Sequence, residues 1–375
     1  MGYVAVTGGE QAIAASLDLN ELRRVEAGRS VAVEDILAAM PDLVNQVQSE
    51  GSLWAPEIAA VAIKQACGSI EEAVFLMRAY RSTLERLYTS RVVDTDGMRA
   101  GRRISAAFKD IEGGQILGAT RDYSHRLIEF ELADETVSDA RERAREIRSS
   151  LSAPADADAA ALLDRVPRVL TYLRSIDMVR DWPVDDTEPV DITKTPLSFP
   201  APRSVILQAL SRGLTQAVVA IGYAAIRGFG LSHPTVGELR RGTVAIEIDA
   251  PGASEDAAED AYYLGSIPVT EVESLIVSDE EDGDGGHRSA LDVGYGLVMG
   301  DDESKAIAMS VLDHSLRADD VRFPTQDQEF VLYHIDGVEA TGFISHLKLP
   351  HYVTFQSKLD SALRSAAEKG GEADA

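Results

Sequence analysis

Two histidines near the C-terminal end of the sequence have the spacing of a candidate metal site. They are His346 and His351, in the segment GFISHLKLPHYVTFQ (342–356), with Pro350 between them. On a continuous helix a spacing of five residues separates side chains by about 140°, and the proline disfavours such a helix. A turn would bring both imidazoles together, and neutral imidazoles suit Zn²⁺, although a zinc site needs further ligands. The spacing alone leaves two interpretations open, part of a zinc site or a turn capped by two histidines, and it favours the second.

A second segment, AGRRISAAFKDIEGGQILGATRDYSHRLIEF (100–130), concentrates positive charge in an otherwise acidic protein. Its glycines allow the backbone to approach a ligand closely, and cations beside a glycine turn can hold a polyphosphate. A solvated basic helix followed by a turn explains the same residues equally well. The basic residues are Arg102, Arg103, Lys109, Arg121, His125 and Arg126, and the glycines include Gly113, Gly114 and Gly118.

A third segment, TKTPLSFPAPRSVILQALSRG (193–213), offers further anion contacts through Lys194, Arg203 and Arg212. An ordinary loop followed by a helix is the favoured interpretation here. The glycine motif GYGLVMG (294–300) lacks the spacing of a dinucleotide fingerprint. Acidic residues follow it, and these would repel a phosphate at a helix N-terminus. No G-x-S-x-G or cysteine–histidine pattern indicates a hydrolase nucleophile.

The composition is that of a folded, strongly acidic protein, with 375 residues, 45% of them hydrophobic, and a net charge of −26 at pH 7. Such a charge repels nucleic acid unless the basic residues are segregated. The single cysteine, Cys67, excludes an internal disulfide, a cysteine-based zinc site and an iron–sulfur cluster carried by this chain alone. No stretch approaches the roughly 20 apolar residues of a membrane helix, and the first residues lack the features of a signal peptide. We therefore expect a cytoplasmic protein.

These segments must be positioned by a fold that we expect to be α+β, with a mainly helical N-terminal part and a mixed α/β C-terminal part. Helical periodicity dominates residues 1–110 and returns at 203–228 and 302–317, whereas 243–249 and parts of 262–277 alternate like strands. We expect three regions. They are a helical N-terminal region with the basic glycine-rich segment (1–130), a charged and proline-rich linker (131–190), and a mixed region that contains the HLKLPH motif (191–375).

Taken together, several segments of the chain resemble the PhnI family. The matching stretches spread over nearly the whole chain in family order, and HLKLPHYV and GGQILGATRDYSHRL are the most specific. Departures lie mainly in 131–190 and 251–292, so nothing functional is transferred to those regions. The other matching stretches are YVAVTGGEQAI, RAYRSTL, MRAGRRISAAFKDIE, DITKTPLSFPAPRS, GYGLVMGDDESKAIAMSVLD and QEFVLYHIDGVEATGFIS.

The resemblance implies a subunit of the bacterial carbon–phosphorus lyase machinery. Such a subunit belongs to a core complex with PhnG, PhnH and PhnJ, expected to be symmetric with two copies of each chain, and the ATPases PhnL and PhnK are further candidate partners. The implied reaction is a synthase step, in which a phosphonate displaces adenine from ribose C1′ of ATP and gives an α-D-ribose 1-phosphonate 5-triphosphate. Alone, such a subunit can act as a purine nucleosidase. The alternative is a non-catalytic scaffold that organises the complex while its partners hold the active site.

The resemblance also implies roles for individual residues. In this family the histidines of HLKLPH hold a metal ion at the contact with PhnJ, so His346 and His351 are expected zinc ligands. Cleavage of a glycosidic bond builds oxocarbenium charge, which a carboxylate stabilises, while an acid protonates the departing base. We hypothesise that His125 is the acid and that Asp110 or Asp122 faces the sugar. Candidate ligands of the triphosphate and the phosphonate are Arg102, Arg103, Lys109, Gly113, Gly114, Arg121, Lys194 and Arg203.

Overall fold

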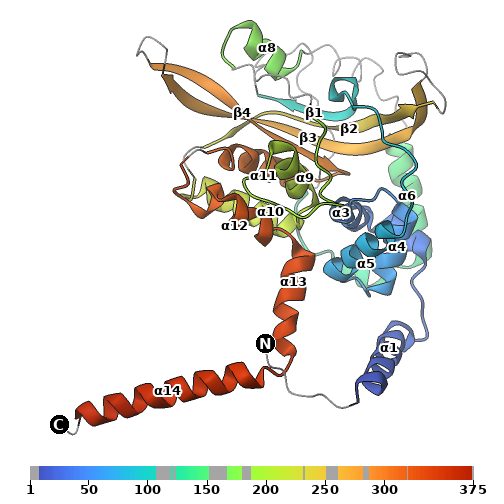
Figure 1. Cartoon of the computed structure of the whole chain (residues 1–375). Coiled ribbons are helices and arrows are strands. Elements are labelled where there is room, and N and C mark those ends of the chain that lie inside the picture. Colours follow the sequence, from blue (N-terminus) through green and yellow to red (C-terminus); the bar gives the residue numbers. More distant parts are fainter. Residues whose placement is uncertain are drawn as a thin grey trace.

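The centre of the molecule is a four-stranded antiparallel sheet with helices on both sides, and a helical arm extends away from this body (Figure 1). This computed structural model describes residues 8–106, 120, 124–151, 167–179, 187–230, 233–250, 261–281, 287–318 and 320–373. The predicted α+β fold, mainly helical at the N-terminus and mixed afterwards, is confirmed.

Helices form the first part of the chain, and their ends follow local signals in the sequence. Pro41 and Pro56 stand at the first helical positions, where their missing N–H groups are tolerated. The hydroxyl of Ser69 accepts a hydrogen bond from the Glu72 amide at 3.4 Å. The second to fifth helices bury one apolar core, whereas the first buries no residue. The helices are α1 (Gly9–Val25), α2 (Val33–Ala39), α3 (Pro41–Gly51), α4 (Pro56–Gln65) and α5 (Ile70–Ser82).

The sheet joins segments that are far apart in the sequence. Its strands, in spatial order, are β1 (Arg99–Ser105), β2 (Thr235–Asp249), β3 (Ala261–Glu281) and β4 (His287–Met299). The helical periodicity of residues 1–110 does not predict β1. This segment is a strand because its backbone pairs with β2, with Arg103 opposite Arg240 and Ile104 opposite Leu239. The sheet therefore connects the first and the third predicted regions.

One face of the sheet is covered by helices and carries the main hydrophobic core. Leu239 and Val272 from the strands share this core with Leu312 from a covering helix. This covering helix, α11 (Glu303–Ser315), approaches β4 closely because Gly294 and Gly296 lack side chains. A Cβ at either position would lie 2.0 Å from a carbonyl oxygen of α11. The glycines of GYGLVMG thus serve packing. The helices on this face are α9 (Arg203–Arg212), α10 (Thr215–Ile226), α11 (Glu303–Ser315) and α12 (Gln328–His334) (Figure 1).

The opposite face of the sheet, here called the polar face, lies under residues 167–179, which include α8 (Val169–Ser175) (Figure 1). Its charged residues lie between two small apolar clusters, one formed with α8 and one around Met98. Side chains alternate between the two faces of a strand, so Leu239 points to the helical core while Glu238 and Arg240 point to the polar face. Both of these charged residues are buried. The polar face is therefore a buried charged layer.

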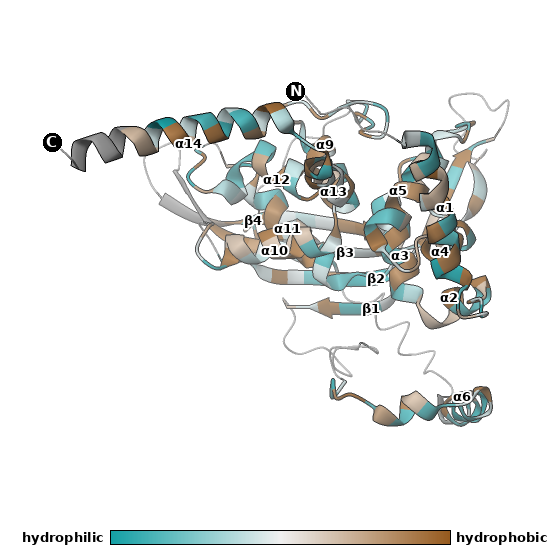
Figure 2. Ribbon diagram, turned by 90° about the horizontal axis from the view of Figure 1, so that it is seen from below, coloured by the Kyte–Doolittle hydropathy of each residue, from teal (hydrophilic) through white to brown (hydrophobic). Residues whose placement is uncertain are grey.

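The C-terminal residues form an arm of α13 (Gly337–Ser345), the 3₁₀ turn η6 (His346–Lys348) and α14 (Tyr352–Ala373). Asp336 begins α13 by accepting hydrogen bonds from the Val338 amide at 3.1 Å and the Glu339 amide at 3.2 Å. Hydrophobic and hydrophilic residues alternate along α14 (Figure 2). Large apolar side chains of the arm are exposed, among them Phe343, Leu347 and Phe355.

The remaining described elements are short or lie at the periphery. They are η1 (Thr95–Gly97), η3 (Phe130–Asp134), α6 (Val137–Leu151) and η5 (Pro324–Gln326). Within the described ranges, no single helix has the length and apolar composition to cross a membrane, and α9 and α10 meet those criteria only as a pair bent by 120°.

Candidate active site

Three buried glutamates lie together on the polar face of the sheet. Glu238 on β2 stands opposite Glu273 on β3, and Glu271 stands opposite Arg240. Each of the three glutamates is at most 3% exposed. Because opposed like charges repel and buried carboxylates lose their hydration, this cluster requires cations close by.

Arg168, which directly precedes α8, supplies one of these cations and contacts all three glutamates. Its Nη2 lies 3.3 Å from Glu271 Oε2, its Nε lies 3.3 Å from Glu238 Oε2, and it also pairs with Glu273 and with Asp96. Burial by itself would lower the pKa of Arg168, but the four carboxylates outweigh this effect and raise it. Arg168 is therefore held permanently charged, and it ties the α8 segment to the sheet.

Two further arginines complete the neutralisation of the cluster. Arg103 on β1 donates from Nε to Glu238 Oε1 and from Nη2 to the Pro167 carbonyl at 3.0 Å. Arg240 donates from Nε to Glu271 Oε2 at 3.0 Å. Glu271 and Glu238 therefore each have two arginine partners.

A cavity of about 370 Å³, here called the glutamate cavity, opens beside this cluster. The Tyr295 hydroxyl donates to Glu271 Oε1 at 2.9 Å in its wall. Burial, helped by the neighbouring Glu271 and Glu238 charges and opposed by Arg168, raises the pKa of Glu273 to about 7. Its Oε2 atom is buried and has no hydrogen-bond partner among the described residues. The lining residues include Thr95, Arg168, Arg174, Arg203, Glu271, Glu273 and Tyr295.

The glutamate cavity combines groups that suit cleavage of a glycosidic bond. Glu273, with its raised pKa, could give a proton to a departing base, while Glu271 could face positive charge that develops on a sugar. The sequence interpretation missed both residues. The available signal was the alternation T-E-V-E-S at 270–274, which places two acidic residues on one face of an apolar strand.

The turn predicted between His346 and His351 does bring their rings together. The ring centroids are 5.4 Å apart and the planes are inclined by 72°. Each ring directs Nδ1 to a backbone carbonyl, His351 to Leu349 at 2.6 Å and His346 to Phe343. Because a carbonyl only accepts, Nδ1 carries the proton and Nε2 keeps the lone pair that a metal requires. Among the described residues, no group of three or more His, Cys, Asp or Glu side chains could hold a metal.

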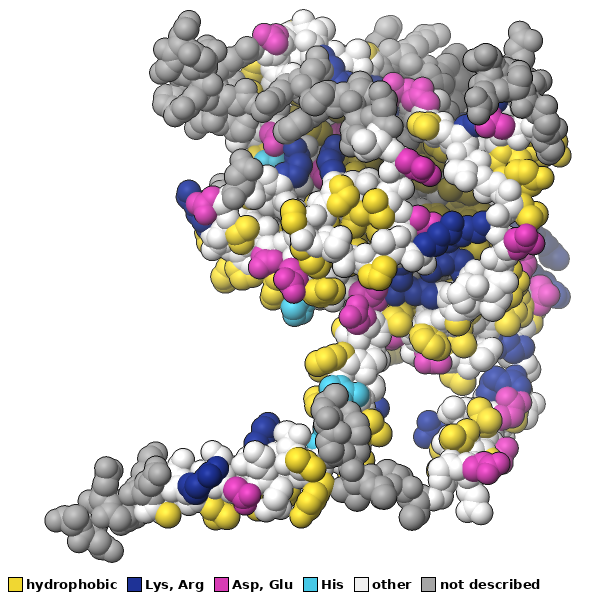
Figure 3. Space-filling view, viewed as in Figure 1, with side chains coloured by type: hydrophobic (Ala, Val, Ile, Leu, Met, Phe, Trp, Pro, Cys, Tyr) yellow, Lys and Arg dark blue, Asp and Glu magenta, His cyan; other side chains and the backbone are white. Residues whose placement is uncertain are grey.

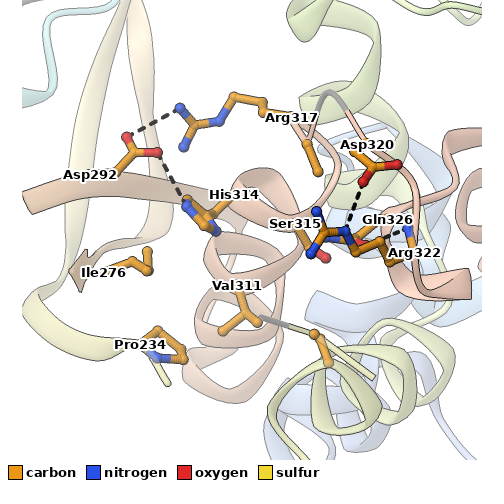
Figure 4. A pocket seen from close by; sticks show the side chains of 13 residues that line it. Pro234, Ile276, Asp292, Val311, His314, Ser315, Arg317, Asp320, Arg322 and Gln326 are labelled. Carbon is orange, nitrogen blue, oxygen red and sulfur yellow. Dashed lines mark hydrogen bonds and ion pairs between the residues drawn. The ribbon is translucent and has the colours of Figure 1, made fainter. Parts of the chain in front are cut away.

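Another cavity, of about 310 Å³, lies between the end of α11 and β4 (Figure 4). Asp292 in its wall lies 3.2 Å from His314 Nε2 and 3.3 Å from Arg317 Nη1. Burial alone would raise the pKa of Asp292, but the hydrogen bond from His314 and the charge of Arg317 lower it to about 2. Since its carboxylate is already paired with His314 and Arg317, this cavity is a weaker candidate site.

Comparison with known proteins identifies the family. Residues 2–369 match the family model described as "Bacterial phosphonate metabolism protein (PhnI)". The chain belongs to the PhnI family. It is 42% identical over 375 residues to the "Putative C-P lyase subunit protein HtxH" of Stutzerimonas stutzeri, which covers 98% of this chain and 97% of the relative. It is 40% identical over 375 residues to the "Alpha-D-ribose 1-methylphosphonate 5-triphosphate synthase subunit PhnI" of Escherichia coli (strain K12), and the match covers 98% of this chain and 99% of the relative. The protein of the same name from Rhizobium meliloti (strain 1021) is 39% identical over 383 residues, and the match covers 99% of this chain and 98% of the relative.

With the PhnI family established, the predicted anion ligands can be placed in the fold. Arg102 and Arg103 are neighbours on β1 and point to opposite faces of the sheet. Arg102 donates from Nε to Glu303 Oε1 at 2.6 Å, whereas Arg103 contacts Glu238 on the polar face. Both arginines are buried and bound to carboxylates. Their role as ligands of the triphosphate stays a prediction.

Much of the PhnI-like glycine segment lies outside the described residues. This applies to Lys109, Asp110, Gly113, Gly114, Arg121 and Asp122. His125 is described and exposed. Thr120 and Ser124 line a cavity of about 720 Å³ whose other walls carry Asp42, Asp301, Asp302 and Glu303. The described part of this cavity is therefore acidic rather than basic, with Arg241 as its described cation.

Lys194 and Arg203, from the third predicted segment, lie in different surroundings. Lys194 is exposed, and its Nζ is 4.0 Å from Asp191 Oδ2. Arg203 begins α9 and lines the glutamate cavity, while its guanidinium donates to Asp313 at 3.1 and 2.9 Å. Arg203 is thus a predicted substrate ligand that the structure places beside the candidate active site.

Proposed function

We propose that this chain is a subunit of a carbon–phosphorus lyase system that displaces adenine from ribose C1′ of ATP with a phosphonate. The product would be an α-D-ribose 1-(alkyl)phosphonate 5-triphosphate, and the chain alone would act as a purine nucleosidase. Two relatives of about 40% identity over almost the whole chain carry the name of such a synthase subunit, which supports the reaction class. The observation that carries the chemistry is the glutamate cavity, in which Glu273, whose pKa is raised to about 7, lies beside Glu271, which pairs with Arg168 and Arg240.

The proposed step assigns a separate task to each of the two glutamates. A phosphonate oxygen forms the bond to C1′ as the bond from C1′ to the adenine nitrogen breaks, and the electron pair of that bond leaves with the base. Glu273 gives its proton to the departing adenine and is left as a carboxylate, which takes a new proton from water. Glu271 stabilises the positive charge on the sugar. The Tyr295 hydroxyl, 2.9 Å from Glu271 Oε1, fixes the orientation of that carboxylate.

Zinc is part of the proposal at the histidine turn. His346 and His351 fit the role of ligands because their Nδ1 atoms are directed to carbonyls, but two ligands do not complete a zinc site. We propose that a partner subunit supplies the remaining ligands, as the family resemblance implies for PhnJ. Bound Zn²⁺ would act there as a Lewis acid or as a cross-link between the chains.

The proposed setting is a cytoplasmic complex with PhnG, PhnH and PhnJ, with PhnL and PhnK as possible ATPase partners and two copies of each core chain. A scaffold without catalytic residues of its own is the second candidate function. The arm favours it, because Phe343, Leu347 and Phe355 expose 69%, 61% and 62% of their surfaces, and apolar side chains gathered on one projecting element are typical of a protein contact.

Adenine release separates the two candidates. The purified chain is incubated with ATP, with and without PhnG, PhnH, PhnJ and methylphosphonate, and the base and ribosyl products are separated by chromatography. A catalytic subunit releases adenine from ATP by itself, whereas a scaffold alone releases none although the complex with its partners still assembles.

Substitution of the glutamates then tests the assigned roles. Glu273→Gln keeps the shape but removes the proton, so adenine release should fall by roughly 10²–10⁴-fold. Glu329→Gln, an exposed carboxylate on α12, is the matched control and should leave the rate unchanged. Undiminished release from Glu273→Gln would remove Glu273 from the mechanism.

A further inference from the structure

Four arginines form a cluster at the junction of α5 and the end of α9. The arginine cluster consists of Arg78 and Arg81 on α5, Arg86 just after it, and Arg212 at the last position of α9. Lys and Arg side chains gather on this side of the molecule, next to the place where α13 leaves the body (Figure 3). In a chain with a net charge of −26, such a concentration of positive charge stands out from the average surface.

The cluster is electrostatically strained because its arginines repel one another. Burial and the neighbouring Arg78 charge lower the pKa of Arg212 to about 10, with only partial compensation from Asp336. Burial, Arg78 and Arg86 likewise lower the pKa of Arg81. Both guanidinium groups would therefore gain from an additional anion.

The contacts within the cluster use more carbonyls than carboxylates. Arg78 donates to both Asp336 oxygens, at 2.8 and 2.9 Å, and Arg86 pairs with Asp191. Arg81 donates to the Gly51 carbonyl at 2.8 Å, and Arg78 also donates to the carbonyls of Glu50 at 3.0 Å and Arg212 at 3.4 Å.

Arg212 has the weakest set of partners among the four. It donates from Nη1 to the Ile192 carbonyl at 3.3 Å, and its Nη2 is 4.0 Å from Asp336 Oδ2. Its Nε is buried without a hydrogen-bond partner among the described residues. Three of the four arginines thus share two carboxylates, Asp191 and Asp336, while Arg81 contacts a carbonyl, and a buried donor of Arg212 is left over.

Space for a ligand lies beside this donor. A cavity of about 320 Å³ is lined by Arg212, the member of the cluster that reaches it, by Thr195 and Tyr333, and by the carboxylates Asp336 and Glu339. Lys194 adjoins Thr195 in the sequence. α9 connects this cavity with the glutamate cavity, since Arg203 at its first position lines one and Arg212 at its last position lines the other. Nine helical residues separate the two arginines by about 14 Å along the helix axis.

We propose that the arginine cluster binds an oligophosphate, a linear chain of phosphoryl groups. A guanidinium group matches two phosphate oxygens at once, and several linked phosphoryl groups match several arginines held in one place. The ligand would supply the missing negative charge and an acceptor for Arg212 Nε. This inference rests on the proposed function, in which the cluster would hold the 5′-triphosphate of the substrate.

The test is calorimetric titration of the full-length chain with tripolyphosphate, with ATP and with inorganic phosphate. Tripolyphosphate should bind, and Arg81→Gln and Arg212→Gln should each weaken its binding by about 10-fold or more, because each removes a charge-assisted contact. Arg143→Gln, on the exposed face of α6 and paired with Glu146, is the matched control and should bind as the unaltered chain does. Arg212→Lys keeps the charge but loses the fork of donors, so its affinity for tripolyphosphate should lie between that of Arg212→Gln and that of the unaltered chain.

The ligands distinguish the sources of the phosphoryl chain. Displacement of ATP by tripolyphosphate would support the nucleotide as the natural ligand, whereas binding of tripolyphosphate without such competition would support a free oligophosphate. Inorganic phosphate binding as tightly as tripolyphosphate would overturn the proposal. So would unchanged tripolyphosphate binding by both glutamine variants with unaltered melting temperatures.

Failure of this inference is separable from failure of the proposed function. If the assembled complex releases adenine while the arginine variants bind tripolyphosphate normally, the cluster is not the oligophosphate site and the reaction stands. If the cluster binds tripolyphosphate as expected but no adenine is released, the proposed reaction is contradicted while the oligophosphate site is supported.

Discussion

The glutamate cavity and the arginine cluster both contain half-buried or buried arginines, but in opposite charge balance. In the first, Arg103, Arg168 and Arg240 face three glutamates and Asp96, and the pKa of Arg168 is raised. In the second, three of four neighbouring arginines share two aspartates, and the pKa of Arg212 is lowered. An arginine surrounded by carboxylates holds the fold together, whereas an arginine surrounded by other arginines remains open to a ligand.

The largest expected effect follows from breaking the glutamate side of this comparison. Arg168→Met leaves Glu238, Glu271 and Glu273 without their shared cation, and uncompensated buried charge is costly. We expect the free energy of unfolding to fall by about 3–5 kcal/mol, measured by urea denaturation at pH 7.5.

A control variant shows whether this loss comes from burial. Arg143→Met removes the exposed partner of Glu146 on α6 and should change the unfolding free energy by less than about 0.5 kcal/mol. A loss of similar size in both variants would contradict the structural role of Arg168.

The second prediction concerns pH and the raised pKa of Glu273, about 7 against an ordinary value of 4.5. Between these two values the folded protein keeps a proton that the unfolded chain has released, so stability falls as pH rises through this window and levels off above 7. The fall should reach up to about 3 kcal/mol.

Glu273→Gln isolates this contribution, because its side chain does not titrate. Urea midpoints measured from pH 5 to pH 8 should decline more steeply for the unaltered protein than for the variant. Parallel curves would show that Glu273 is ionised throughout and would remove its role as an acid.

The third prediction sharpens the contrast between the two regions. Arg212→Met removes a cation whose charged form is disfavoured by burial and by Arg78, so the unfolding free energy should stay the same or rise by about 1 kcal/mol. A loss above about 2 kcal/mol in urea denaturation would instead group Arg212 with Arg168 as a structural arginine.

The smallest effect on stability is expected at the histidine turn, which lies outside both charge networks. His346→Ala removes a half-buried ring and should change the melting temperature of the isolated chain by no more than about 2 °C. In the purified complex the same change should remove the bound zinc, measured by atomic emission. Full zinc content in the variant would place the metal elsewhere.

The sequence by itself determined the family, the α+β class and the closeness of the two histidines, because these depend on local motifs, periodicity and a turn at Pro350. It could not determine β1, whose strand conformation comes from pairing with β2, more than 130 residues later. Nor could it determine the environment of each charge. Arg102 and Arg103 are neighbours in sequence and face opposite sides of a sheet, while Glu238, Glu271 and Arg168 come together from three separate segments. Whether a charged side chain is neutralised or left available depends on burial and on distant partners, and only the tertiary structure decides both.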